Sequence, residues 1–136
     1  MNLPLLSLLV FLPLAGALAI WLLPARATRQ VVALSMIVTL ALGVAALVAY
    51  DAPGARFQLV ERAVWIGSLN VHYLLGIDGV AVLFLPATGL LFLGSLVASW
   101  NAVHDAPRLH YSLLLLLQTA TLGIFCALDT VLFFVF

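Results

Sequence analysis

Charge is what this sequence lacks most. Only 7% of its 136 residues are charged, whereas 66% are hydrophobic. Soluble domains carry about 25% charged residues, because a charged coat keeps a folded chain in solution. Five basic and five acidic side chains cannot coat a chain of this length. The composition therefore excludes a soluble globular fold and predicts an all-α integral membrane protein.

Other absences exclude several kinds of site. The net charge is zero, so no basic face is available to bind nucleic acid. The single cysteine, Cys126, excludes an internal disulfide and a cysteine zinc cage. His104 and His110 are six residues apart, so they do not share a helical face as metal ligands would. The chain has no glycine-rich phosphate loop and no nucleophile beside a base. We therefore expect no catalytic, cofactor-binding or metal-binding residue in it.

Long uncharged runs are what the chain does have. Four of them can cross a hydrocarbon core about 30 Å thick. The predicted membrane helices cover residues 3–23, 31–49, 79–100 and 111–128, and a fifth begins over residues 130–136. The first run also resembles the apolar part of a signal peptide, but no Arg or Lys precedes it, which favours a retained helix. Residues 1–136 are thus predicted to form a single membrane domain, the N-terminal portion of a longer fold.

The longest polar stretch covers residues 50–78, in the second loop. Residues 57–66 and 70–75 are rich in β-branched and aromatic side chains, and Gly67-Ser68 between them is a suitable tight turn. This pattern predicts a short β-hairpin outside the hydrocarbon. An amphipathic helix lying on the membrane surface is the alternative.

Polar and small residues inside the runs have two interpretations each. Gln118 and Thr121 either pack against a neighbouring helix or line a path. The alanines at 41, 45 and 49 either form a stripe that lets helices approach closely, or are there only because alanine is common in such helices.

Pro86 lies in the middle of the third run, where a kink is tolerated. Trp100 ends the third run, a position typical of an interfacial ring.

No ionisable side chain lies in the middle of an apolar run. Asp78 and Asp129 both precede a predicted helix. An acid at this position can cap free N–H groups, and its negative charge is stabilised by the positive end of the helix dipole. A direct role in a proton path is the alternative. The loop with Arg26 and Arg29 carries no acid, so the positive-inside rule places it in the cytoplasm and the N-terminus outside.

Four segments together resemble one family. They are Trp65-Ile66-Gly67 with Tyr73-Leu74-Leu75-Gly76-Ile77-Asp78-Gly79, then Ala98-Ser99-Trp100, then Leu122-Gly123-Ile124-Phe125, then Ala127-Leu128-Asp129 followed by residues 130–136. In this order the chain resembles the N-terminal part of subunit M of bacterial NADH–quinone oxidoreductase (complex I), the counterpart of mitochondrial NADH dehydrogenase subunit 4. The pattern from Gly123 to Asp129 favours subunit M over the related subunit L.

The resemblance implies a proton-translocating, antiporter-like fold of about fourteen helices in two inverted repeats. It implies a multi-pass protein of the bacterial inner membrane, with lipid and other complex I membrane subunits as partners. Quinone, flavin and iron–sulfur clusters are expected in those partner subunits. The family's proton-path glutamate is expected on the fifth helix, just beyond residue 136, so no proton-path residue is carried over, and we expect residues 1–136 alone to be unstable and to conduct no protons.

Two other classes remain open from sequence. One is a subunit of a related cation/proton antiporter or membrane-bound hydrogenase, which shares the local pattern. The other is a small structural or assembly membrane protein, or a non-functional truncated product.

Overall fold

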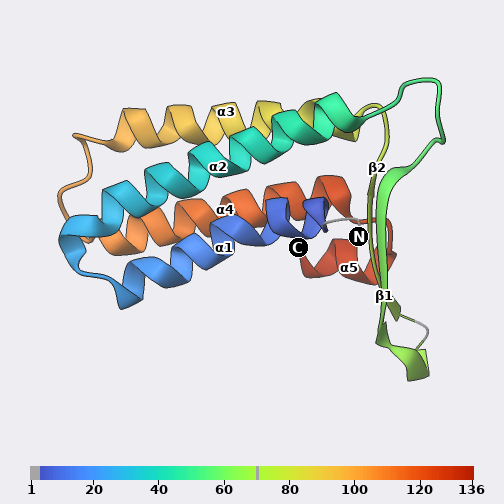
Figure 1. Cartoon of the computed structure of the whole chain (residues 1–136). Coiled ribbons are helices and arrows are strands. Elements are labelled where there is room, and N and C mark those ends of the chain that lie inside the picture. The colour runs from blue at the N-terminus through green and yellow to red at the C-terminus, as the bar shows by residue number, and fades with distance from the viewer. Residues whose placement is uncertain (1–3, 70) are drawn as a thin grey trace.

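The computed structural model describes residues 4–69 and 71–136. Four long helices lie side by side, and a two-stranded hairpin stands across one end of them, next to a short fifth helix (Figure 1). The helices are α1 (Leu5–Leu22), α2 (Thr28–Ala49), α3 (Ala81–Ser99), α4 (Pro107–Cys126) and α5 (Thr130–Val135). The strands are β1 (Gln58–Ile66) and β2 (Val71–Ile77), and 3-10 turns cover Ala25–Ala27 and Gly67–Leu69.

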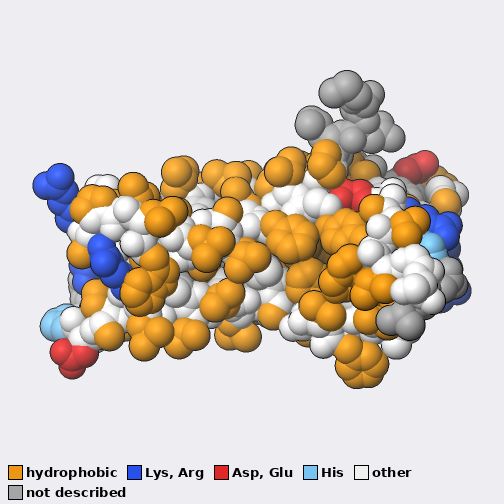
Figure 2. All heavy atoms as spheres, turned by 90° about the horizontal axis from the view of Figure 1, so that it is seen from below, with side chains coloured by type: hydrophobic (Ala, Val, Ile, Leu, Met, Phe, Trp, Pro, Cys, Tyr) orange, Lys and Arg blue, Asp and Glu red, His pale blue; other side chains and the backbone are white. Residues whose placement is uncertain are grey.

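The four long helices have the length and composition of membrane spans. They contain 18, 22, 19 and 20 residues, which at about 1.5 Å per residue gives lengths of roughly 27–33 Å. Apolar side chains cover the flank of the bundle and charged ones gather at its two ends (Figure 2). The predicted fold class is confirmed: four membrane helices, the start of a fifth, and a hairpin between the second and third helices.

The bundle has two apolar cores, one towards each end. Helix α1 packs mainly against α2 and α4, and α2 packs against α3. Leu9, Leu85 and Leu122 belong to the core near the hairpin. Ile20 and Leu115 belong to the core near the opposite end. Between these cores the helices bury polar side chains, which are described below.

The helix ends differ from the predicted ones by a few residues. Leu3, where the first helix was predicted to begin, lies outside the described residues. Helix α2 begins at Thr28 rather than residue 31, and α4 begins at Pro107 rather than residue 111. Hydropathy misses these polar first turns, although Pro107 suits the first helical position, where no N–H is needed. Helix α3 begins two residues later than residue 79 and ends one residue before Trp100.

The end of α4 was also predicted too late. The helix stops at Cys126 rather than residue 128. Ala127 then forms an isolated bridge with Leu75, and the N–H of Leu128 donates to the carbonyl of Leu74 at 3.0 Å. The chain leaves the helix because it pairs with β2 before α5 begins.

The hairpin is antiparallel and irregular near its start. Glu61 pairs with Leu75 and Ala63 with Tyr73, and the register shifts between Gln58 and Glu61. Leu59, inside this shift, has a φ of 52°, a left-handed conformation that is uncommon for such a residue. Bulges of this kind redirect side chains. The observed hairpin excludes the surface-helix alternative; residue 70, the predicted start of its second arm, lies outside the described residues.

The alanine stripe predicted as a possible contact between helices is exposed instead. Alanines 41, 45 and 49 all lie on the surface. The close approach of α2 to α3 is made by Gly43, where an added Cβ would meet the backbone nitrogen of Pro86 at 3.1 Å. Gly89 approaches the Leu40 backbone in the same way, at 3.0 Å. Glycine rather than alanine therefore carries this helix contact, because only the missing Cβ lets the two backbones come so close.

Candidate functional site

A layer of buried polar side chains separates the two apolar cores. Its members lie near the middle of α2, α3 and α4, and none is more than 8% exposed: Ser35, Thr39, Thr88, Gln118 and Thr119. Small residues face this layer, since a Cβ added to Gly16 of α1 would clash with the Ser35 hydroxyl. Polar groups are costly in a bilayer unless they are satisfied. The layer is thus the first candidate for function.

Gln118 stands out within this layer. Its side chain is completely buried, and neither its amide oxygen nor its amide nitrogen has a hydrogen-bond partner among the described residues. The Thr119 hydroxyl, on the next residue, also has no partner within residues 4–69 and 71–136. Such an amide forms four hydrogen bonds when satisfied, and leaving it unpaired costs about 1–3 kcal/mol. We therefore expect the Gln118 amide to bind a water molecule or a further polar group.

Two hydroxyls in or near this layer are bonded within their own helices. Thr39 donates to the carbonyl of Ser35 at 2.7 Å, and Thr121 donates to that of Leu117 at 2.8 Å. These are bonds within one helix. Thr121, which we predicted to pack or to line a path, is therefore bonded to its own helix. Gln118 is not.

The layer cannot release a proton by itself. Its members are amides and hydroxyls, and no Asp, Glu, Arg or His lies at this level in residues 4–69 and 71–136. Such groups can orient water or pass a proton along a chain of hydrogen bonds, but they do not titrate near neutral pH. Across the same described ranges, no group of three His, Cys, Asp or Glu side chains could hold a metal ion.

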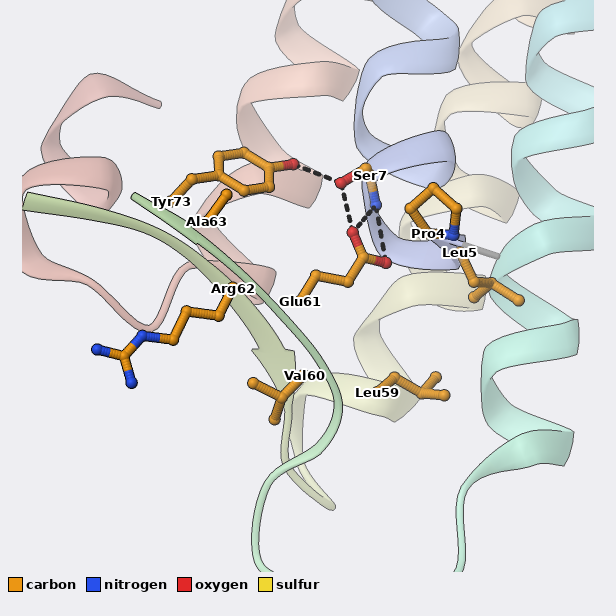
Figure 3. A pocket seen from close by; sticks show the side chains of 9 residues that line it. All are labelled: Pro4, Leu5, Ser7, Leu59, Val60, Glu61, Arg62, Ala63 and Tyr73. Carbon is orange, nitrogen blue, oxygen red and sulfur yellow. Dashed lines mark hydrogen bonds between the residues drawn. The ribbon is translucent and has the colours of Figure 1, made fainter. Parts of the chain in front are cut away.

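A second cluster closes the hairpin end of the bundle. The Glu61 carboxylate accepts hydrogen bonds from the N–H of Leu6 at 2.7 Å, the N–H of Ser7 at 3.1 Å and the Ser7 hydroxyl. The Ser7 hydroxyl also contacts the Tyr73 hydroxyl at 2.6 Å. Figure 3 shows the three side chains converging at the edge of a pocket of about 560 Å³ between α1 and β1.

The strand register explains this convergence. Residues paired across antiparallel strands face the same side of the sheet, and so do residues two apart. Leu75 is completely buried, and Glu61 is its partner. Glu61 and Tyr73 therefore both point at the bundle. Burial raises the pKa of Tyr73 above its usual value, and the nearby Glu61 carboxylate adds to this, while its bond to Ser7 partly offsets the rise.

Each helix that begins at the hairpin end is capped by an acid. Glu61 caps α1 from the hairpin. Asp78 accepts from the N–H groups of Val80 at 3.1 Å and Ala81 at 2.7 Å, at the start of α3. Asp129 caps α5, where its carboxylate accepts from the N–H groups of Val131 at 2.8 Å and Leu132 at 3.2 Å. The structure thus places Asp78 and Asp129 in capping positions, with no contact to the polar layer.

Asp129 also joins α5 to the hairpin. Its carboxylate accepts from the backbone N–H of His72 at 3.5 Å. The pKa of Asp129 lies below its usual value, first because of the bond from the Leu132 N–H, and further because of the bonds from Val131 and His72 and the charge of His72. The acid therefore stays ionised, as a cap at a positive helix end requires.

Trp100 lies at the opposite end of the bundle. It follows the last residue of α3 and is 36% exposed. The Arg29 guanidinium lies 5.7 Å from the centre of its ring, which is cation–π range. This position agrees with an interfacial ring.

Sequence reasoning missed Glu61. It was noted only as one charge in a polar loop, because its contacts with Leu6 and Ser7 join residues more than 50 positions apart. A signal was present: α1 begins with Pro4 and has no Ser, Thr, Asp or Asn to cap it, so a cap from elsewhere was to be expected.

The chain is similar to known membrane subunits of quinone oxidoreductases and related dehydrogenases. No protein-family model matches the chain. The chain is 38% identical to NAD(P)H-quinone oxidoreductase chain 4 2 of Thermosynechococcus vestitus, over 96% of this chain and 25% of that protein. It is 33% identical to F(420)H(2) dehydrogenase subunit M of Methanosarcina mazei, over 98% and 27%. It is 28% identical to NADH-quinone oxidoreductase subunit M of Rickettsia typhi, over 100% and 29%.

The chain is homologous to the chain 4/subunit M proteins. The resemblance drawn from its motifs is confirmed, and these relatives favour it over an antiporter, a hydrogenase subunit or an assembly protein. The subunit M homologue described here spans about a quarter of the length of these relatives. Its similarity extends over nearly the whole chain, so the hairpin and all four membrane helices lie within the shared region.

Proposed function

We propose that this chain is part of a membrane-arm subunit of a respiratory NADH–quinone oxidoreductase, and that it contributes to proton translocation coupled to quinone reduction. The observation that carries the proposal is similarity to subunit M and chain 4 proteins over 96–100% of the chain. The buried polar layer around Gln118 supports the proposal, because an unpaired amide in the middle of the membrane does not stabilise a helix bundle.

The redox chemistry is proposed to belong to partner subunits. Quinone, flavin and iron–sulfur clusters would be bound there, and this chain would bind no cofactor. The relatives support this division, since their names give NAD(P)H in one case and F(420)H(2) in another for similar membrane subunits. Similar membrane subunits thus carry names with different electron donors, which is expected if the donor binds to another subunit. The other membrane subunits of the complex are its proposed protein partners.

The proposed location is the bacterial inner membrane, with the N-terminus and the hairpin outside. The arginine distribution supports this orientation: Arg26, Arg29 and Arg108 lie at the end opposite to the hairpin, with Asp105 as the acid there. Loops facing the cytoplasm carry such an excess.

Deletion of the gene tests the proposal. Membrane vesicles from the deletion strain should lose NADH-driven proton uptake and regain it when the full-length gene is restored, whereas succinate-driven uptake stays unchanged. Intact NADH-driven proton uptake in the deletion strain would refute the assigned function.

A residue-level test addresses the polar layer. In the full-length protein, Gln118→Leu should reduce proton uptake more than quinone reduction, because an apolar side chain orders no water. Thr121→Val is the matched control, since this hydroxyl already bonds to its own helix. Equal effects of the two substitutions would show that Gln118 only packs.

A further inference from the structure

The end of the bundle opposite to the hairpin is basic. Arg26 lies in the turn before α2, Arg29 in the first turn of α2, and Arg108 in the first turn of α4. Asp105 is the acid in the connection between α3 and α4. Figure 2 shows basic side chains, together with an acidic one, at one end of the apolar flank, and further charged side chains at the opposite end. Within the described ranges, no carboxylate lies within ion-pair distance of any of the three arginines.

Arg108 brings the basic groups together. Its Nη2 donates to the carbonyl of Leu23 at 2.7 Å, at the end of α1 and three residues before Arg26. Residues three apart span at most about 11 Å of chain. One hydrogen bond thus holds the start of α4 against the turn that carries Arg26. The indole of Trp21 reinforces this contact by donating to the Ser112 hydroxyl at 2.9 Å.

Several hydrogen-bonding groups at this end are unused. The Nε of Arg108, the Nε2 of His110 and the hydroxyl of Thr28 are buried and have no partner in the described part of the chain. Thr28 as a whole is only 2% exposed. A guanidinium has five N–H donors, and burying a donor without an acceptor is costly. The Arg108 Nε–H can only donate, whereas the Thr28 hydroxyl and, in one tautomer, the His110 ring nitrogen can also accept.

The helix ends add to the positive potential. Helices α2 and α4 both begin at this end, and neither has a side-chain cap or an acid in its first turn. The free N–H groups of a helix start carry roughly half a positive charge. The bare helix starts and the arginines favour an anion with several acceptor oxygens.

The surface beside these groups is apolar. Leu22 is 87% exposed, Leu18 is 62% exposed and Trp21 is 57% exposed, on the part of α1 that leads to Arg26. Acyl chains would lie along this surface while a phosphate lay among the arginines. We propose that this end of the bundle binds the phosphate of an anionic phospholipid, through the guanidinium groups of Arg26 and Arg108 beside the bare helix starts. This site is independent of the proposed role in proton translocation.

Lipid titration of the purified full-length protein tests the site. Delipidated protein in neutral detergent is titrated with phosphatidylglycerol, and binding is followed by tryptophan fluorescence. We expect phosphatidylglycerol to bind at least tenfold more tightly than phosphatidylcholine. Arg26→Gln should weaken that binding about tenfold, because each charge-assisted contact to a phosphate is strong. Arg56→Gln removes the same charge at the hairpin end and should leave it within twofold.

Arg108→Gln should weaken binding more than Arg26→Gln does. Because Arg108 also bonds to Leu23, its substitution could prevent folding; Arg26, which makes no hydrogen bond among the described residues, then decides the question. Equal affinity for the two lipids, or unchanged affinity in Arg26→Gln, would overturn the proposal. Inorganic phosphate that displaces the lipid at comparable concentration would also overturn it, because the site would then bind a soluble anion.

Discussion

Replacing Glu61 by alanine should destabilise the bundle, although the residue lies outside the membrane helices. The carboxylate accepts three hydrogen bonds at the start of α1, two of them from backbone N–H groups that nothing else caps. A helix cap contributes about 1 kcal/mol. The negative charge at the helix start adds about 0.3–1 kcal/mol, and two unsatisfied, partly buried donors raise the cost further. We expect Glu61→Ala to lower the free energy of unfolding by about 2 kcal/mol, roughly a thirtyfold change in the equilibrium constant.

Unfolding in mixed micelles, followed by far-UV circular dichroism as a denaturing detergent is added, measures this loss. Glu61→Gln keeps an acceptor oxygen but removes the charge, so it should lose about half as much. Asp51→Asn removes the same charge from the same loop, where the Asp51 side chain makes no hydrogen bond to any described residue, and should stay within about 0.5 kcal/mol of the unchanged protein. Equal stability of Glu61→Ala and Asp51→Asn would show that Glu61 does not cap α1.

Three further predictions concern other parts of the chain. Gly89→Ala should lower the unfolding temperature because its Cβ would press on the backbone of α2, whereas Gly94→Ala, with open space around it, should raise it slightly; the reverse order would contradict the packing. The pKa of Asp129 is lowered in the fold, so the stability that the ionised carboxylate contributes is complete above about pH 4, the usual range of an aspartate, and is lost as the pH falls through the lowered pKa. The difference in unfolding free energy between the unchanged protein and Asp129→Asn should therefore shrink below about pH 4. A constant difference between pH 7 and pH 3 would refute a capping role for the ionised Asp129. In intact cells, an impermeant maleimide should label Ser68→Cys but not Ala102→Cys, because the hairpin is proposed to face outside and the α3–α4 connection the cytoplasm. The native Cys126 is fully buried and should not react. Labelling of Ala102→Cys but not of Ser68→Cys would show that the proposed orientation is wrong.

The spans and the hairpin were predictable because each depends on local sequence. A run without charge must lie in lipid, and its length sets the number of crossings. The helix ends were less predictable, because Thr28 and Pro107 begin helices with polar first turns that hydropathy does not detect. The end of α4 at Cys126 depends on pairing between Ala127 and Leu75, which is a contact between distant parts of the chain.

The contacts of the candidate sites were not predictable from local pattern. Gln118 was identified as a polar residue in a span, but only the packing shows that its amide has no partner in the described part of the chain, while Thr121 bonds to its own helix. The alanine stripe lies on the exposed face of α2 and makes no contact between the described helices, since spacing alone does not say which face meets a neighbour. Glu61 escaped notice because a bulge at Leu59 and the strand register together turn it towards α1.

The alternation of helix direction explains the chemistry of both ends. Consecutive helices run in opposite directions, so α1, α3 and α5 all begin at the hairpin end and α2 and α4 at the other. Every helix start is positive and in need of acceptors. At the hairpin end the chain supplies them itself, through Glu61, Asp78 and Asp129. At the other end α2 and α4 begin beside arginines, with no side-chain cap and no acid in the first turn, so we expect an anion from outside the described chain to meet these helix starts. The proposed orientation and the proposed phospholipid site rest on the same asymmetry: the acids of the chain lie at the helix starts of one end, and arginines lie at the helix starts of the other.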